Sequence, residues 1–316
     1  LMSTFKEIRG QLIKSLSSDP SPAAAGDMWY NSSTNLLKGV VLSGAWSAGG
    51  ALSVPRSLKS LNAGTQTAGI AFAGYNGTTF GNTTATEEYN GSSWTGGGAL
   101  STARRGGAGF GVQTAAVLGG GYATGSFPAS TNATEEYNGS SWTGGGNMPA
   151  NLSNQSGCGT LTAGLSNGST ETPTQACIYD GSSWTAIPSL PTGRNSGGTA
   201  GTSAAAIAAG VFPGTDSYEW SGSSWTAGPD LNSARPNANM FGTSTAAILG
   251  GNPSPTATEE WNGTNWSVTG ATMGTPRSDY GTGGTTTAGL AFGGSPYTTS
   301  TEEYSLAAAT KTFTTS

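Results

Sequence analysis

The sequence predicts an all-β protein, a six-bladed β-propeller preceded by a short N-terminal helix and a β-hairpin. A tryptophan returns at intervals of 48, 48, 42, 41 and 41 residues. It follows nearly the same phrase each time, as in TATEEYNGSSWTGGG and ATEEYNGSSWTGGG. A repeat of this length that is rich in strand formers and glycine is typical of a propeller blade. The tryptophans are Trp46, Trp94, Trp142, Trp184, Trp225 and Trp266.

The second full repeat illustrates the four strands that we expect in one blade. The innermost strand covers 103–112, the second 114–120 and the third 131–137. The dipeptide Asn138-Gly139 then provides the positive φ angles of a two-residue hairpin, and a short fourth strand covers 141–143. This frame predicts one sheet of four antiparallel strands in every repeat.

Apolar runs and aromatic residues recur in the same frame, which gives the count of blades. The second strand reads TAGIAFAG at 67–74 and TAAILGG at 245–251, without polar alternation. Such runs indicate strands that are buried on both faces. One aromatic residue falls five positions before each tryptophan of the full repeats, and Tyr304 holds the same place in a sixth. These aromatics are Tyr89, Tyr137, Tyr179, Trp220, Trp261 and Tyr304.

Arginine and glutamate also repeat, and we interpret both as structural. Because they recur around the ring, most of them cannot converge on one site, so we expect them to bridge neighbouring strands or blades. Leu152 replaces the arginine in the third blade. The arginines are Arg56, Arg104, Arg194, Arg235 and Arg277, and the acidic pairs are Glu87-Glu88, Glu135-Glu136, Glu259-Glu260 and Glu302-Glu303.

Two segments compete for the outer strand of the sixth blade. Trp46 lies in SGAWSAGG near the start of the chain, and Phe313 lies in the C-terminal segment ATKTFTTS. Only one of them can occupy the position, and an open ring would leave sheet edges exposed. We favour the C-terminal segment, so that the propeller covers 46–316.

The first 45 residues depart from the repeat. The apolar residues Phe5, Ile8, Leu12, Ile13 and Leu16 follow helical spacing after a T-x-x-E capping box. A helix of this length is not stable alone in water. It either docks on its own propeller or anchors the chain in an oligomer or larger particle. We therefore assign 1–27 to an anchoring helix and linker, and 28–45 to a hairpin lead-in.

Composition excludes several classes of function. The chain has no histidine, which removes the commonest general base and metal ligand, and we expect no catalytic residue, metal or cofactor. Its net charge of −5 and lack of a basic patch argue against nucleic acid, and no apolar run could span a membrane. The spacing of Cys158 and Cys177 across an intervening strand favours two free thiols.

Function is expected where the repeats differ. The loops between second and third strands are unequal in length, and the long ones carry exposed aromatics amid Asn, Ser and Thr, which suits stacking on sugar faces. The alternative is that these rings fold back over the blade tops. Asp279 and Tyr280 are likewise outside the repeat. The candidate ligand-binding residues are Tyr75, Phe80, Tyr122, Phe127, Tyr297 and Arg105, the last out of repeat register.

The repeat resembles kelch and galactose-oxidase-like propellers, with a glycine pair after an apolar strand, an aromatic, a turn, a tryptophan and an arginine. The TEEYNGSSWTGGG repeats and the lead-in GDMWYNSSTNLLKG also look like structural proteins of marine tailed phages. This resemblance implies a non-enzymatic virion surface protein, a tail fibre or decoration protein. Its N-terminal segment would contact other virion proteins in a large assembly, and its propeller would face host glycans. The alternatives are a protein–protein scaffold and, less favoured, a glycan-active enzyme.

Overall fold

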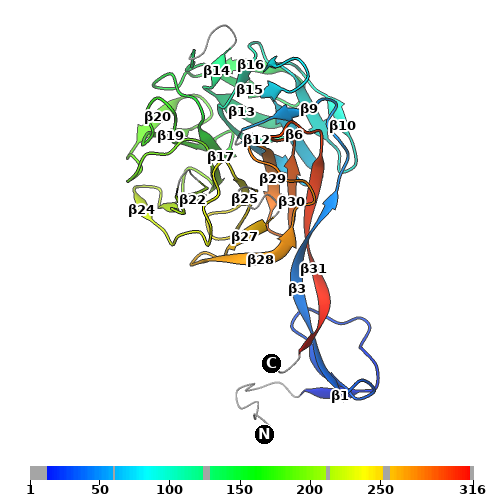
Figure 1. Cartoon of the computed structure of the whole chain (residues 1–316). Coiled ribbons are helices and arrows are strands. Elements are labelled where there is room, and N and C mark those ends of the chain that lie inside the picture. Colours follow the sequence, from blue (N-terminus) through cyan, green and yellow to red (C-terminus); the bar gives the residue numbers. More distant parts are fainter. Residues whose placement is uncertain (1–12, 60, 124–128, 211–213, 252–256, 314–316) are drawn as a thin grey trace. The chain divides into compact units, whose positions relative to one another are not determined.

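The computed structural model describes residues 13–59, 61–123, 129–210, 214–251 and 257–313, and these form an all-β protein without a helix. The chain divides into two compact units. The repeat body covers Ala45–Ser305, and the terminal body combines Leu1–Gly44 with Leu306–Ser316. Figure 1 labels many of the strands in both bodies.

The repeat body contains six sets of four strands, which we call repeats 1 to 6. Neighbours within each set pair antiparallel, from an inner to an outer strand. Repeat 1 contains β5 (Leu61–Thr65), β6 (Ala68–Phe72), β9 (Thr86–Tyr89) and β10 (Trp94–Gly96), and repeat 2 contains β12 (Ala108–Val112), β13 (Ala115–Gly119), β15 (Thr134–Tyr137) and β16 (Trp142–Gly145). Repeat 3 contains β17 (Ser156–Thr160), β18 (Ala163–Asn167), β19 (Ala176–Tyr179) and β20 (Trp184–Ile187), and repeat 4 contains β21 (Gly198–Gly201), β22 (Ala206–Ala209), β23 (Tyr218–Trp220) and β24 (Trp225–Ala227).

The last two repeats complete the body. Repeat 5 contains β25 (Asn239–Gly242), β26 (Ala247–Gly250), β27 (Ala257–Trp261) and β28 (Trp266–Thr272). Repeat 6 contains β29 (Gly281–Thr285), β30 (Ala288–Phe292), the start of β31 (Thr301–Phe313) and the end of β3 (Leu36–Ala48). The inner strands β5, β12, β17, β21, β25 and β29 each contact the next, and β29 also contacts β5.

The NGSSW phrase forms the turn between the third and outer strands. In repeat 1 the Asn90 side chain accepts hydrogen bonds from the backbone N–H groups of Ser92 and Ser93, at 3.0 and 2.9 Å. Gly91 between them has φ +89°, a conformation that glycine adopts at no steric cost. The turn returns the chain so that Trp94 packs on Tyr89, with ring centroids 4.9 Å apart.

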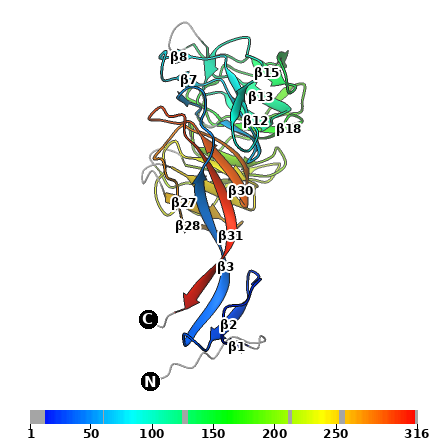
Figure 2. The ribbon, with the colours of Figure 1, turned by 90° about the vertical axis from the view of Figure 1, so that its right-hand side faces the viewer.

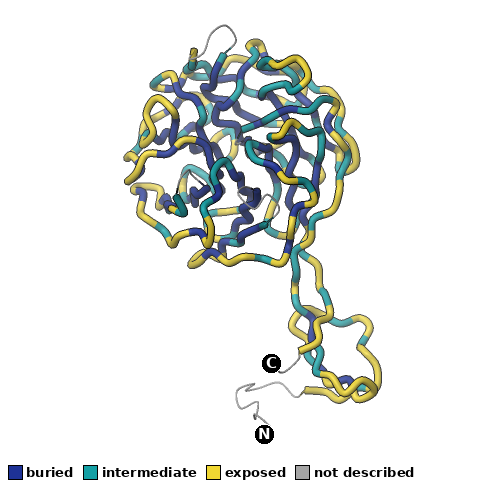
Figure 3. Tube along the Cα trace, viewed as in Figure 1, coloured by how far each residue is buried: buried dark blue, intermediate teal, exposed yellow. Residues whose placement is uncertain are grey.

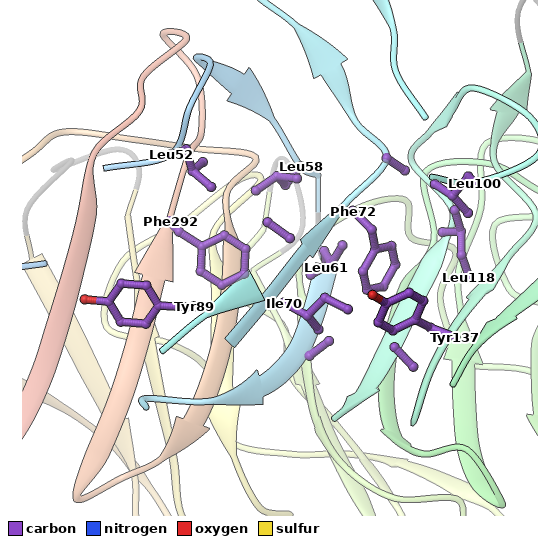
Figure 4. Packing of buried hydrophobic residues seen from close by; sticks show 14 of the residues in the cluster. Leu52, Leu58, Leu61, Ile70, Phe72, Tyr89, Leu100, Leu118, Tyr137 and Phe292 are labelled. Carbon is purple, nitrogen blue, oxygen red and sulfur yellow. The ribbon is translucent and has the colours of Figure 1, made fainter. Parts of the chain in front are cut away.

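The core lies between successive repeats. The second strands are buried on both faces, as at Ala116, Val117 and Leu118 in β13, and Figure 3 shows buried trace running through the repeat body with exposed turns at its rim. The outer-strand tryptophan of one repeat packs on the preceding repeat, since the rings of Trp142 and Phe72 lie 4.8 Å apart. Figure 4 shows Phe72 and Phe292 among other buried hydrophobic residues of this part of the core.

Trp46, and not Phe313, occupies the outer-strand position of repeat 6. Its ring lies 5.2 Å from that of Tyr304, the same relation that Trp94 has with Tyr89. The prediction that the C-terminal segment forms this outer strand was wrong. The strand β31 runs without a turn from Thr301 to Phe313 and therefore cannot fold back on itself. The strand β3 lies beside it instead (Figures 1 and 2).

The terminal body is a small sheet. The strand β1 (Lys14–Leu16) pairs in parallel with β2 (Met28–Asn31), and β2 forms an antiparallel hairpin with β3. Asp19 holds the sheet by accepting hydrogen bonds from Trp29 and Asn31 and by pairing with Lys38 at 2.7 Å. These hydrogen bonds, that of Lys38 first, lower the pKa of Asp19 to about 2.

The predicted N-terminal helix is wrong where the chain can be described. Ile13 is 39% exposed just before β1, and Leu16 is the last residue of that strand. Phe5, Ile8 and Leu12 lie outside the described residues. The physical reason is that backbone pairing with β2 satisfies the polar groups of Lys14–Leu16, whereas an isolated helix of about 14 residues is marginal in water.

Candidate binding pocket

The repeated arginines and glutamates form buried ion pairs within single repeats. Arg56 contacts Glu87 at 2.6 Å, and the same pair recurs in repeats 2, 5 and 6. The guanidinium also donates to backbone carbonyls, and the second carboxylate oxygen accepts from the backbone of the preceding loop, as from Ser53 at 2.8 Å. The other pairs are Arg104–Glu135 at 2.8 Å, Arg235–Glu259 at 2.7 Å and Arg277–Glu302 at 2.5 Å.

In three of the four acidic pairs, the second glutamate connects neighbouring repeats instead. Tyr137 of repeat 2 donates a hydrogen bond to Glu88 of repeat 1 at 2.5 Å, and Tyr89 of repeat 1 donates to Glu303 of repeat 6 at 2.7 Å. Tyr179 bonds Glu136 in the same way. Burial and then the bond to Glu88 raise the pKa of Tyr137 to about 12, so this phenol remains a donor at neutral pH.

Four of the six outer-strand tryptophans supply a second connection between repeats. The Trp142 indole N–H donates to the Thr86 hydroxyl at 2.9 Å, from repeat 2 to repeat 1. Equivalent bonds join Trp46 to Thr258, Trp94 to Thr301 and Trp184 to Thr134, at 3.2, 2.9 and 2.9 Å. These recurring residues therefore account for the packing of the repeats.

Repeats 3 and 4 lack the ion pair. Leu152 and Cys177 stand at the arginine and glutamate positions of repeat 3, so that both charges are replaced together. In repeat 4, Tyr218 replaces the glutamate, and Arg194 is buried with its Nε and Nη1 groups unpaired among the described residues. Burial lowers the pKa of Arg194 to about 10.

The departures from the repeat gather elsewhere, in one pocket of about 370 Å³. It is lined by loops of repeats 1, 2 and 6, where short strands position the side chains. These are β4 (Arg56–Ser57), β7 (Tyr75–Asn76) and β8 (Gly81–Asn82) in one sheet and β11 (Arg104–Arg105) with β14 (Tyr122–Ala123) in another. The lining residues are Ser57, Lys59, Tyr75, Arg105, Asp279, Ser295 and Tyr297.

The aromatic residues of the pocket stack on one another. Tyr75 and Tyr297 have ring centroids 5.7 Å apart and an interplanar angle of 28°. The Arg105 guanidinium lies 4.6 Å from the centroid of Tyr75 and 5.9 Å from that of Tyr122, which are cation–π distances. Tyr297 is 43% exposed and is therefore the ring of this stack that offers surface to a ligand. A Cβ on Gly77 would lie 2.4 Å from that of Tyr297, so only glycine permits this approach.

Asp279 provides the acidic group of the pocket. It has φ +51°, a left-handed conformation. Its backbone N–H donates a hydrogen bond to the Asn237 carbonyl, and its own carbonyl accepts hydrogen bonds from the backbone N–H groups of Leu58 and Lys59. The Oδ1 atom of the carboxyl is buried and has no hydrogen-bond partner among the described residues. Burial raises the pKa of Asp279, and the charge of Lys59 opposes this shift.

The same backbone position recurs in other repeats, two residues after the arginine position. All these residues have positive φ, which explains why small or amide side chains predominate there. A carboxylate occurs there only in repeat 6. The residues are Gly106, Asn154, Ser196, Asn237 and Asp279.

Only some of the ligand-binding residues predicted from the sequence line the pocket. Tyr75, Arg105 and Tyr297 line the pocket together, and Tyr122 is buried beneath Arg105 at 6% exposure. Phe80 is 70% exposed and does not line the pocket, although its carbonyl accepts a hydrogen bond from Tyr75. Phe127 lies outside the described residues. Tyr280 is buried and donates to the Asn239 and Gly250 carbonyls, which indicates a structural role.

Sequence reasoning missed Lys59, Ser57 and Ser295. A signal for Lys59 was present, because it is a cation of the repeat body that does not occupy the repeated arginine position. The prediction of two free thiols is confirmed, since Cys158 and Cys177 are unpaired and buried. Burial raises the pKa of both thiols.

A scan against protein-family models found no match, and a search of curated proteins found no similar sequence. Within the described part of the chain, no helix is long and apolar enough to cross a membrane. The same residues contain no cluster of three histidine, cysteine or acidic side chains that would hold a metal ion.

Proposed function

We propose that this is a non-enzymatic structural protein of a virion, with a kelch-like propeller displayed outward to bind host-surface glycans. Six repeats of four antiparallel strands, whose inner strands contact one another in a closed cycle, support a six-bladed propeller. The buried pairs and inter-repeat bonds of the repeated residues support the same arrangement. The virion assignment rests on the resemblance of the repeat phrase and lead-in to structural proteins of tailed phages.

The observation that carries glycan binding is the convergence of non-repeated residues on one pocket. Residues from repeats 1, 2 and 6 meet there, and they combine an exposed aromatic ring with charged groups and serine hydroxyls. The volume lies within the ~300–1,000 Å³ typical of small-molecule sites. An aromatic face beside polar groups is the combination that recognises a sugar, because sugars have apolar faces and hydroxyl edges.

The terminal body supports attachment to other proteins. Several large apolar side chains are exposed on it, with Leu42 at 55%. Contiguous exposed apolar surface marks interaction sites, and we infer that these side chains supply such a surface on the terminal body. The exposed residues are Ile13, Tyr30, Leu36, Leu42 and Phe313.

The same exposed residues favour a second candidate, a protein scaffold without glycan recognition. A scaffold of this kind should sediment as a complex of defined size, which Leu42→Asp disrupts, and it should show no binding to any glycan. The attachment protein should retain glycan binding in the Leu42→Asp variant, because Leu42 belongs to the terminal body and not to the pocket.

The test is a glycan-array screen of the full chain and three variants. Tyr297→Ala removes the exposed ring, and Gly77→Ala forces a Cβ into the space of Tyr297. Gly81→Ala is the matched control on the same loop, since nothing lies within 4 Å of its Cβ position. We expect the first two variants to lose binding and the control to retain it. Absence of binding by the unaltered chain, or equal binding by all variants, would overturn the glycan assignment to this pocket.

A further inference from the structure

The cations of the repeat body are unevenly distributed. Between residues 45 and 305 the sequence contains seven lysines and arginines. Five of them occupy the repeated arginine position and are at most 2% exposed. The remaining two are Lys59 and Arg105, and both line the pocket.

Neither of these two cations is used for packing in the way that the repeated arginines are. In the part of the chain that the structure describes, the ion pairs of the repeat body involve Arg56, Arg104, Arg235 and Arg277. The Arg105 guanidinium is held over Tyr75, with Tyr122 also nearby. Stacking on aromatic rings orients a guanidinium while its N–H groups at the edge stay able to bind a carboxylate or sulfate.

The charge of the pocket contrasts with that of the chain. With Asp279 ionised, Lys59 and Arg105 leave one net positive charge in the pocket, whereas the whole chain has a net charge of −5. An anionic ligand that approaches the repeat body therefore finds its accessible positive groups in this pocket. A concave site of one sign concentrates the field and attracts the opposite charge.

Asp279 adds a second requirement. Its buried Oδ1 atom lacks a hydrogen-bond partner among the described residues and lies at a residue that lines the pocket. The Asp279 side chain as a whole is half-buried and lines the pocket, so its carboxylate can accept a hydroxyl hydrogen from a bound ligand. A ligand that satisfies the pocket therefore has both an anionic group and hydroxyl donors.

We propose that the pocket selects acidic glycans, with the carboxylate or sulfate of a sugar bound by Arg105 and Lys59 and a sugar hydroxyl donated to Asp279. This proposal rests on the glycan-binding function proposed above. It names the class of ligand, which the stacking of the aromatic rings alone does not.

The test is an array in which each neutral oligosaccharide is paired with its uronic-acid and its sulfated counterpart. The full chain should bind one of the acidic forms at least about tenfold more tightly than the neutral form, since charge-assisted hydrogen bonds are worth this much. Which acidic form binds distinguishes carboxylate from sulfate. Arg105→Gln and Lys59→Gln should abolish this preference for the acidic form, whereas Arg105→Lys, which keeps a positive charge, should retain part of it. Lys311→Gln, at an exposed residue outside the pocket, is the matched charge control.

The outcomes separate the two proposals. Equal binding of neutral and acidic forms, or an acidic preference that survives Arg105→Gln, would overturn the acidic selectivity while the glycan-binding function stands. An array without any bound glycan would overturn both. Thermal melting of each variant ensures that a loss of binding is not a loss of folding.

Discussion

Glu259→Gln in repeat 5 should destabilise the protein strongly. The Arg235–Glu259 contact is 2.7 Å long, and the two side chains are 2% and 0% exposed. The other carboxylate oxygen accepts hydrogen bonds from the backbone and side chain of Asn232, at 2.8 and 3.0 Å. Glutamine matches glutamate in shape but has a single carbonyl oxygen, so its NH2 group must face either Arg235 or Asn232.

The expected loss is about 3–5 kcal/mol in the free energy of unfolding, because the change leaves a buried arginine without its counter-charge. This is a large part of the ~5–15 kcal/mol that stabilises a typical domain. Denaturant unfolding followed by tryptophan fluorescence measures it. Asp230→Asn at an exposed position is the charge-matched control and should change stability by less than about 0.5 kcal/mol.

A loss below about 1 kcal/mol for Glu259→Gln would show that this ion pair does not stabilise the fold as we expect. It would mean that the repeated pairs are solvated or interchangeable, and that their recurrence does not report the packing of the repeats. A loss for Asp230→Asn equal to that for Glu259→Gln would contradict the expectation as well, since the effect would then follow net charge instead of burial.

Three further predictions concern other parts of the repeat body. In denaturant unfolding, Arg194→Leu should lower the free energy of unfolding by at least about 2 kcal/mol less than Arg277→Leu does. Removal of Arg277 leaves the carboxylate of Glu302 buried without its counter-charge, whereas Arg194 is not paired with a carboxylate. Thr134→Val should cost about 1–3 kcal/mol by leaving the buried Trp184 indole N–H unpaired, and equal melting of variant and parent would contradict this. The raised pKa of Asp279 means that its protonated form stabilises the fold at low pH, and this contribution is lost as pH rises above the ordinary value of 3.8. In the Asp279→Asn variant, the free energy of unfolding should therefore fall less steeply above that pH than in the parent. An unchanged dependence of this free energy on pH would contradict the prediction.

Local pattern was sufficient to predict the sheets of the repeat body. The apolar second strands and the Asn-Gly turns are defined by short stretches of sequence, and both are found where the pattern predicts them, as at Ala116 and Asn90. The pairing of arginine with the first glutamate was only expected in general terms. Its exact partner depends on which face of the third strand each glutamate occupies.

The outer strand of repeat 6 could have been predicted more closely. In the other repeats a glycine-containing turn separates the aromatic from its tryptophan, whereas SLAAATKT between Tyr304 and Phe313 has no glycine, proline or asparagine. Without a turn the strand continues, and Trp46 is left as the partner of Tyr304. The helix prediction over Ile13–Leu16 failed because helical spacing of apolar residues does not reveal a competing sheet partner.

The pocket could be predicted only in part. The aromatic residues of the long loops and Arg105 were visible as departures from the repeat. The meeting of Lys59 with Asp279 was not, because the two residues are about 220 positions apart in the sequence and are joined by contacts between repeats 1 and 6. Such a contact depends on the arrangement of the repeats, which no local pattern specifies.

A crystal structure of the full chain with the best glycan from the array would show whether the pocket of repeats 1, 2 and 6 binds a sugar. We expect a sugar ring against Tyr297 and an anionic group within about 3 Å of Arg105. A glycan bound at another place on the repeat body, with this pocket empty, would contradict this expectation.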